Sequence, residues 1–370
     1  MRTMPVENIA VMGGGKRRFW GLDILRISLA LLVYMFHSHM HFKCNYYFLN
    51  NFVEVGAIAM TGFMILSGFV LFISYSNKDF TKMSEVKSFY LKRVISIVPL
   101  YYSIALIHIL YQIYVGQISL KDVAILFPVE LFSVQSTYFS LFRFSHNGGT
   151  WFISCILICY ALYPYLQFII SGISNKFRVI TLLLISGLLL YAPLVRMYFH
   201  LDMVTIYANP FYRLLEFMIG IILAKFICIG YKHKILSLII HPITLIITIL
   251  FMVFSISVIR HYYHTNDYML FNWIALPCLI LIILNLVYIP FKSIQHSQIV
   301  SYLSSIAFTF YLCQVLPLWD TSRFICNMLG SYNNFLKIAI SLTICFLGAI
   351  FIHEGIEKPA SKYLKTKLLE

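Results

Sequence analysis

The sequence predicts an all-α fold, a polytopic transmembrane helical bundle of about ten helices. Of its 370 residues, 60% are hydrophobic and only 11% are charged, whereas soluble globular proteins carry about 25% charged residues. Apolar runs long enough to cross a bilayer as helices recur along the whole chain. They fall at residues 19–41, 52–76, 94–115, 150–170, 178–199, 208–229, 237–259, 269–289, 299–320 and 336–356.

The uneven distribution of Lys and Arg orients this bundle. The segments between the runs, taken alternately, hold 19 of the 28 Lys and Arg residues on one side and 8 on the other, and Arg26 lies inside the first run. Because cytoplasmic loops carry the excess of Lys and Arg, both termini are expected in the cytoplasm. The net charge of +14 therefore does not indicate a nucleic-acid partner, since the charges fall in short loops.

One integral-membrane domain, residues 19–365, is expected between a cytoplasmic tail at 1–18 and a short C-terminal tail at 366–370. The first run follows a basic cluster, as a signal peptide does, but it is longer than a typical signal core and lacks a small-residue cleavage site. It is therefore expected to be retained. The semi-apolar connection at 116–149 is expected outside the cell, as a re-entrant or interfacial segment.

Three ionisable residues inside the first run mark it as a candidate site. Charged groups are costly in hydrocarbon, so they usually face a protein interior and mark function. Arg26 and His37 are eleven residues apart, which places them on one helix face about 16 Å apart. Asp23 lies three residues before Arg26 and can pair with it. His37 is a candidate general base, although a histidine near a helix end can also be purely structural.

A metal site is not expected. His37 and His41 share a helix face, but no Cys or carboxylate follows at ligand spacing. The eight cysteines are scattered, mostly within apolar runs, and form no CxxC pair. They are interpreted as small packing residues.

A basic cluster at the inner mouth of the third run is a candidate anion site. It contains Lys87, Lys92 and Arg93, which suit a phosphate-rich cytosolic cofactor. The general excess of positive residues in cytoplasmic loops is the alternative explanation.

Two stretches near the outer side are candidates for substrate binding. Asn147 begins an Asn-Gly-Gly-Thr segment with irregular backbone, which ends at Trp151. Its glycines would let a substrate approach the backbone closely, although Trp at a membrane interface is common. Arg213 and Glu216 are three residues apart and are expected to pair on a helix, in a structural or a substrate-binding role.

Taken together, these stretches resemble the acyltransferase 3 family of bacterial membrane O-acyltransferases. GLDILRISLALLVYMFH (21–37) is similar to the family's first-helix motif, an Arg and a His separated by ten residues. The other similar segments are FMILSGFVLF (63–72), FYLKRVISIVPLYY (89–102), WFISCILICYALYP (151–164), LLEFMIGIILA (214–224), SSIAFTFYLCQ (304–314) and IEKPASKYLK (356–365). The chain departs from the family at Ser96, where a further Arg is usual, and at Gln314, where His is frequent.

The resemblance implies transfer of an acyl group, most simply acetyl, from cytosolic acyl-CoA to a hydroxyl of an envelope or exopolysaccharide carbohydrate, free or lipid-linked. It implies a multi-pass protein of the bacterial inner membrane, with no metal. His37 would be the base, Arg26 would stabilise charge or contact the cofactor, and Asp23 would hold Arg26. The basic cluster would bind the CoA phosphates. A transporter or flippase for a small solute or glycan precursor explains the helices equally well, but not the ordered motifs.

Overall fold

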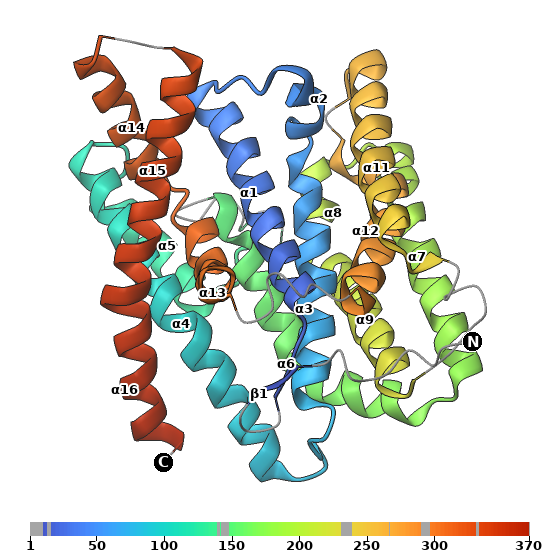
Figure 1. Cartoon of the computed structure of the whole chain (residues 1–370). Helices are drawn as coiled ribbons and strands as arrows, with labels where there is room; N and C mark the ends of the chain where they lie inside the picture. Colours follow the sequence, from blue (N-terminus) through green and yellow to red (C-terminus); the bar gives the residue numbers. More distant parts are fainter. Residues whose placement is uncertain are drawn as a thin grey trace.

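The computed structural model describes the chain except for residues 1–9, 13–15, 139–140, 142–147, 231–238, 266, 290–296, 331–332 and 370. The described residues form a bundle of helices (Figure 1), preceded by a short antiparallel hairpin of β1 (Ala10–Met12) and β2 (Lys16–Arg18). The predicted all-α membrane bundle is confirmed.

The bundle is built from long helices joined by short ones. The long helices are α1 (Trp20–Phe42), α3 (Ala59–Tyr75), α4 (Met83–Tyr114), α6 (Trp151–Gly172), α7 (Asn175–Tyr198), α9 (Pro210–Cys228), α11 (Pro242–Tyr263), α12 (Tyr268–Tyr288) and α15 (Asn334–Ile352). The shorter ones are α2 (Asn50–Val53), α5 (Leu120–Phe132), α8 (Met203–Tyr207), α13 (Gln298–Leu312), α14 (Leu316–Met328) and α16 (Lys358–Leu369). A π-helical turn at His353–Glu357 joins α15 to α16.

The number of candidate spans is slightly below the ten predicted. Among the described residues, eight helices are long and apolar enough to cross a membrane, or nine if the bent pair α13–α14 counts as one span. The remaining run folds as α9. This helix carries three charged residues, Arg213, Glu216 and Lys225, which is more than is expected of a membrane span. The start of α1 and the end of α16 lie at the same end of the bundle (Figure 1), which requires an even number of crossings. A crossing by α9 meets this requirement.

The run at 299–320 was predicted as one helix, and the structure corrects this. The chain bends by 92° between α13 and α14. Pro317 lies in the first turn of α14; in a continuous helix it could not donate to Cys313, and its ring would collide with that carbonyl. The bend places Gln314 between the two helices.

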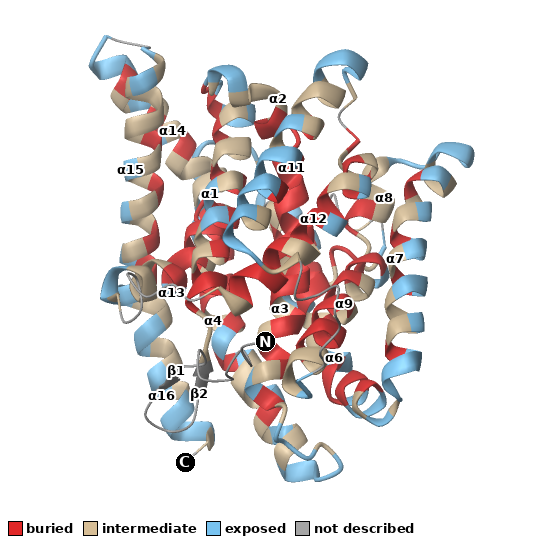
Figure 2. Ribbon diagram, turned by 45° about the vertical axis from the view of Figure 1, so that its right-hand side comes forward, coloured by how far each residue is buried: buried red, intermediate tan, exposed pale blue. Residues whose placement is uncertain are grey.

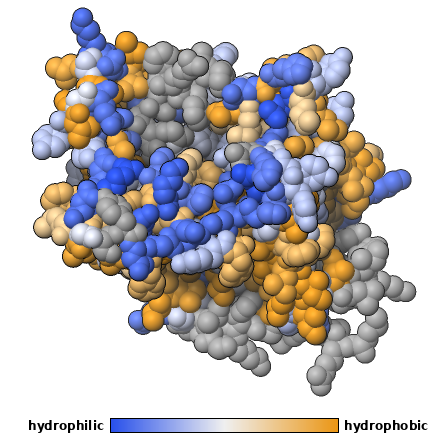
Figure 3. All heavy atoms as spheres, turned by 90° about the horizontal axis from the view of Figure 1, so that it is seen from above, coloured by the Kyte–Doolittle hydropathy of each residue, from blue (hydrophilic) through white to orange (hydrophobic). Residues whose placement is uncertain are grey.

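The core lies where α1, α3, α6, α9 and α12 meet. Figure 2 shows buried residues concentrated in these helices, whereas α7 and α16 carry many exposed residues and α15 is mostly of intermediate exposure. The most extensive helix–helix contact joins α3 to α9. Seen from above, hydrophilic side chains gather across one end of the bundle and apolar side chains lie around it (Figure 3), as expected for a protein surrounded by lipid.

Candidate functional site

A charged network joins the beginning of α1 to α13. Arg18 donates to the buried Asp23 carboxylate through Nε at 2.7 Å, and Ser304 of α13 donates to the same carboxylate at 2.6 Å. Arg26 Nη1 lies 3.4 Å from Asp23 and donates to Ser304 Oγ at 2.8 Å. The predicted neighbours Asp23 and Arg26 therefore lie together, and Ser304 fixes both against a second helix.

His37 lies near the opposite end of α1 and has a different partner, just after the end of α13. Its Nδ1 lies 2.7 Å from Gln314 Oε1, at the bend between α13 and α14. Gln314 Nε2 donates to the Phe310 carbonyl at 3.2 Å. Because that carbonyl can only accept, the amide oxygen faces His37 and accepts a hydrogen bond from the protonated Nδ1. This arrangement leaves the lone pair on His37 Nε2.

A cavity of about 270 Å³ lies between α1, α3, α4, α6 and α13. Arg26 and Arg93, which are remote in the sequence, both line it. The remaining lining is mainly apolar and aromatic, with a few hydroxyls, and consists of Phe63, Ser67, Val70, Leu71, Ser74, Tyr75, Ser96, Ile97, Phe152, Ile156, Tyr160 and Phe308. A narrow apolar cavity with two guanidinium groups suits a slender ligand that carries negative charge.

Aromatic rings hold Arg93 at the wall of this cavity. Its guanidinium carbon lies 5.6 Å from the ring centres of both Tyr75 and Tyr160. Arg93 Nη2 also lies 3.4 Å from the Tyr75 hydroxyl. Arg93 Nε has no hydrogen-bond partner among the described residues, so a donor remains for an anion.

The two predicted lysines lie outside this lining. Lys92 is half-buried, Lys87 is exposed, and neither contributes to the described wall of the cavity. His37 does not line the cavity either. Tyr311 contacts the lining residues Phe63 and Phe152, and it precedes Gln314 by three residues. Tyr311 therefore lies between the cavity and the His37–Gln314 pair along α13.

Arg213 and Glu216 form a buried pair at the centre of the bundle. Their side chains are 0% and 1% exposed, and Arg213 Nη1 lies 2.8 Å from Glu216 Oε2. Thr61 of α3 donates to Glu216 at 2.8 Å. The guanidinium also lies 5.1 Å from the Trp151 ring centre, and Trp151 is itself 7% exposed. Asn147 falls outside the residues that the structure describes.

Several residues of the site were not singled out from the sequence. From the sequence, Arg18 is interpreted only as part of the basic cluster before the first span. Ser304 has no sequence feature that distinguishes it from other serines in helices. The chain has 26 tyrosines, and no sequence pattern distinguishes Tyr75 and Tyr160 from the others. Ser304 could have been identified only from a contact map, because its partners lie far away in the sequence. Arg18 lies only five residues before its partner Asp23, and that spacing is the one signal that the sequence offers.

In the part of the chain that the structure describes, no group of three or more His, Cys, Asp and Glu side chains could hold a metal ion. The ring centres of His37 and His41 lie 5.9 Å apart. The expectation of a metal-free site remains a prediction.

The helices and the cavity define a multi-pass membrane protein with an internal, positively charged site. The family model described as an acyltransferase domain matches residues 19–354, and the chain belongs to this family, acyltransferase 3. It is therefore an acyltransferase, which requires an acyl donor and an acceptor at the bilayer. No curated protein and no solved structure matches the chain significantly. The match favours an enzyme over the transporter or flippase considered from the sequence.

Proposed function

We propose that this protein transfers an acyl group, most simply acetyl, from cytosolic acyl-CoA to a hydroxyl of an envelope or exopolysaccharide carbohydrate in the bacterial inner membrane. The observation that carries the proposal is the cavity that Arg26 and Arg93 line together. Two guanidinium groups in an apolar, aromatic cavity suit a donor with a charged head and a slender acyl-bearing arm.

The donor would enter at the α4 side of the cavity. Arg93, with an Nε that lacks a described partner, would bind a CoA phosphate, and Lys92 and Lys87 would attract the nucleotide from the cytosol. A cavity of about 270 Å³ is at the lower limit of ligand sites, which measure about 300–1,000 Å³. It would therefore hold the pantetheine arm and a short acyl group rather than the whole cofactor.

Arg26 and His37 would act at different points of the donor. They lie about 16 Å apart along α1, so they cannot both contact one carbonyl oxygen. We therefore assign Arg26, held by Asp23, to the pantetheine arm and His37 to the thioester. This assignment requires the arm to extend past Tyr311, from the cavity toward Gln314.

His37 would act through Nε2, because Gln314 fixes the proton on Nδ1. The acceptor hydroxyl gives its proton to Nε2, its oxygen bonds to the thioester carbonyl carbon, and the carbon–sulfur bond breaks. The departing CoA thiolate then takes the proton from His37. Alternatively, Nε2 bonds to the thioester carbonyl carbon and the carbon–sulfur bond breaks, which releases the CoA thiolate. The acceptor oxygen then bonds to that carbon as the carbon–nitrogen bond breaks, and the hydroxyl proton passes to the thiolate, so the same lone pair serves both routes.

The acceptor would approach from the outer end, near Trp151, and a contact of the acceptor with Asn147 stays a prediction from the sequence. Because Arg213 and Glu216 are fully buried in a network with Thr61, we propose that they serve the acceptor site indirectly, by fixing Trp151. A free or lipid-linked glycan would then place its hydroxyl next to His37.

The test uses purified protein in lipid vesicles with labelled acetyl-CoA and an envelope glycan fraction. His37→Ala should reduce transfer at least about 100-fold, as expected for loss of a general base, while the protein remains folded. His261→Ala is the matched control, because His261 is an exposed histidine of α11. Wild-type transfer by folded His37→Ala would exclude the catalytic role.

The acceptor is tested separately by mass analysis of envelope polysaccharides from a strain that lacks this protein. We expect one glycan to lose its acyl substituent and to regain it when the wild-type chain is restored. An unchanged acylation pattern would exclude the proposed carbohydrate acceptor while leaving the acyl donor untouched.

A further inference from the structure

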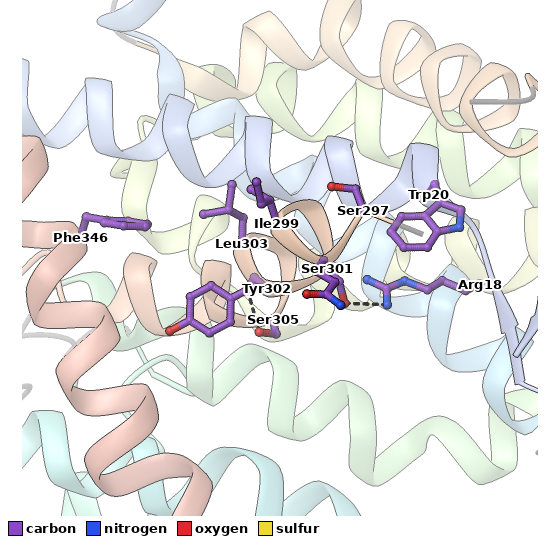
Figure 4. A pocket seen from close by; sticks show the side chains of 10 residues that line it. Arg18, Trp20, Ser297, Ile299, Ser301, Tyr302, Leu303, Ser305 and Phe346 are labelled. Atoms are coloured by element: carbon purple, nitrogen blue, oxygen red, sulfur yellow. Dashed lines mark hydrogen bonds between the residues drawn. The ribbon is translucent and has the colours of Figure 1, made fainter. Parts of the chain in front are cut away.

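A second cavity lies beside the Asp23 network, between the start of α1, α13 and α15. Its volume is about 880 Å³, within the range of about 300–1,000 Å³ typical of ligand sites. Figure 4 shows Arg18 and Trp20 at one end, Phe346 at the other, and side chains of α13 between them. This cavity shares no lining residue with the one that contains Arg26 and Arg93.

The polar end of this second cavity carries an unbalanced positive charge. Arg18 and Arg26 share the single carboxylate of Asp23. No acidic residue among the described lining faces the cavity, so one positive charge of the described network remains near its wall. Arg18 also donates to Ser301 Oγ at 2.8 Å and covers the Trp20 ring at 4.4 Å. This geometry holds the guanidinium at the cavity, where an anion can reach it.

Away from Arg18 the cavity has an apolar side as well as the hydroxyls of Tyr302 and Ser305, and it reaches toward the middle of the membrane. Ile299, Leu303 and Phe346 line it, and Ile299 is 72% exposed, so the cavity opens on the surface of the bundle. Phe346 lies twelve residues after the start of α15, about 18 Å along that helix. The hydrocarbon core is about 30 Å thick, which places Phe346 near its middle, while Arg18 precedes the first span.

We propose that this cavity binds an anionic glycerophospholipid of the inner leaflet. The phosphodiester would pair with Arg18, and one acyl chain would lie along Ile299, Leu303 and Phe346. A single excess positive charge matches the single negative charge of a phosphodiester. The opening toward lipid and the apolar wall distinguish this site from a nucleotide site, which would need several cations and a path from the cytosol.

The lipid site adjoins the proposed donor site through one carboxylate. A phosphate bound to Arg18 would compete with Asp23, and Asp23 would then be held by Arg26 and Ser304 alone. Lipid binding and the position of Arg26 are therefore linked, although the binding itself does not depend on the acyl transfer proposed above.

The test measures the unfolding temperature of the full-length protein in a neutral detergent during titration with short-chain phosphatidylglycerol. A ligand that binds only the folded state raises this temperature, and the rise grows with the ligand concentration relative to its Kd. Phosphatidylcholine of the same chain length, which is zwitterionic, is the arm without net charge. Glycerol 3-phosphate is the arm without acyl chains, and coenzyme A is the nucleotide arm. Only phosphatidylglycerol is expected to raise the unfolding temperature through Arg18.

Three variants define the site. Arg18→Gln should weaken the apparent affinity for phosphatidylglycerol by about tenfold or more, as for loss of a charge-assisted hydrogen bond. Ser305→Trp keeps Arg18 but fills the cavity, and it should abolish the effect even if Arg18→Gln folds poorly. Lys362→Gln, which removes an exposed charge of α16, should behave as wild type.

The proposal is overturned if Ser305→Trp binds phosphatidylglycerol as wild type does, or if phosphatidylcholine acts equally. An equal, Arg18-dependent effect of glycerol 3-phosphate would assign the site to a free phosphate. The same effect of coenzyme A would assign it to the nucleotide.

Discussion

At the scale of single residues, the contact between His37 Nδ1 and Gln314 Oε1 determines which ring nitrogen of the candidate base is free to accept a proton. Helical periodicity alone places Arg26 and His37 on one face of α1. It cannot predict Gln314, because this partner lies 277 residues away in the chain and its position depends on the bend before Pro317. The departure from the family at Gln314 thus marks a residue that contacts the candidate base.

Replacement of Gln314 tests whether it positions His37. Gln314→Leu removes the acceptor for Nδ1–H, so the His37 ring loses both its orientation and its fixed tautomer. We expect kcat for acyl transfer to fall about tenfold or more, with little change in the KM for acyl-CoA.

The conservative variant distinguishes positioning from packing. Gln314→His again presents a nitrogen acceptor to His37 and should recover most of the activity. Equal activity of Gln314→Leu and wild type, or a change confined to KM, would contradict the positioning role.

Arg93 is the residue expected to control donor affinity. Arg93→Gln removes the guanidinium from the cavity while retaining a polar side chain. We expect the Kd for acyl-CoA, measured by equilibrium binding, to rise about tenfold or more through loss of a charge-assisted contact. Lys82→Gln is the control, because Lys82 is an exposed cation of the preceding connection. Unchanged affinity in Arg93→Gln would exclude Arg93 from the donor site.

The contact of α3 with α9 depends on two glycines. A Cβ at Gly68 would lie 2.0 Å from the carbonyl oxygen of Phe217, and a Cβ at Gly220 would lie 2.0 Å from that of Ile65. The helices therefore approach backbone to backbone, as small residues permit in membrane proteins. Both glycines stand in motifs recognised in the sequence, yet only the structure shows that the two motifs meet.

Substitution of these glycines should separate the helices. We expect Gly68→Ala or Gly220→Ala to lower the free energy of unfolding by about 1–3 kcal/mol, the usual effect of overpacking, in a detergent unfolding assay. Gly187→Ala in α7 is the control, since a Cβ there meets nothing within 4 Å and Ala favours a helix more than Gly does. Equal stability of all three variants would contradict the close contact.

At the level of the whole molecule, hydrophobicity and the positions of Lys and Arg predict most of the architecture. Each predicted run corresponds to a helix or a helix pair, because bilayer thickness fixes the length of a span. The exceptions have local causes, a proline between α13 and α14 and charges in α9. The interhelical contacts that build the two cavities could not be predicted, since hydropathy does not specify which helices are neighbours.

A crossing by α9 is the topological prediction that matters most. A charged side chain at the centre of a span costs about 2.5–3.5 kcal/mol, but Arg213 and Glu216 are paired. Lys225 lies in the last turn of α9, where its long side chain can reach the membrane interface. The helix is therefore expected to cross despite its three charges.

Reporter fusions in a bacterial host test this crossing. Alkaline phosphatase, which is active only outside the cytoplasm, should be active when fused after Leu201 and inactive when fused after Gly230, because α9 lies between these positions. A fusion after Lys78, expected inside, and a fusion after Gly116, expected outside, calibrate the assay. Insertion of the reporter at Gly116 of the full chain shows whether truncation changes the result at that position. Activity at both Leu201 and Gly230 would show that α9 does not cross. The C-terminus would then lie outside, and the orientation inferred from Lys and Arg would fail for the second half of the bundle.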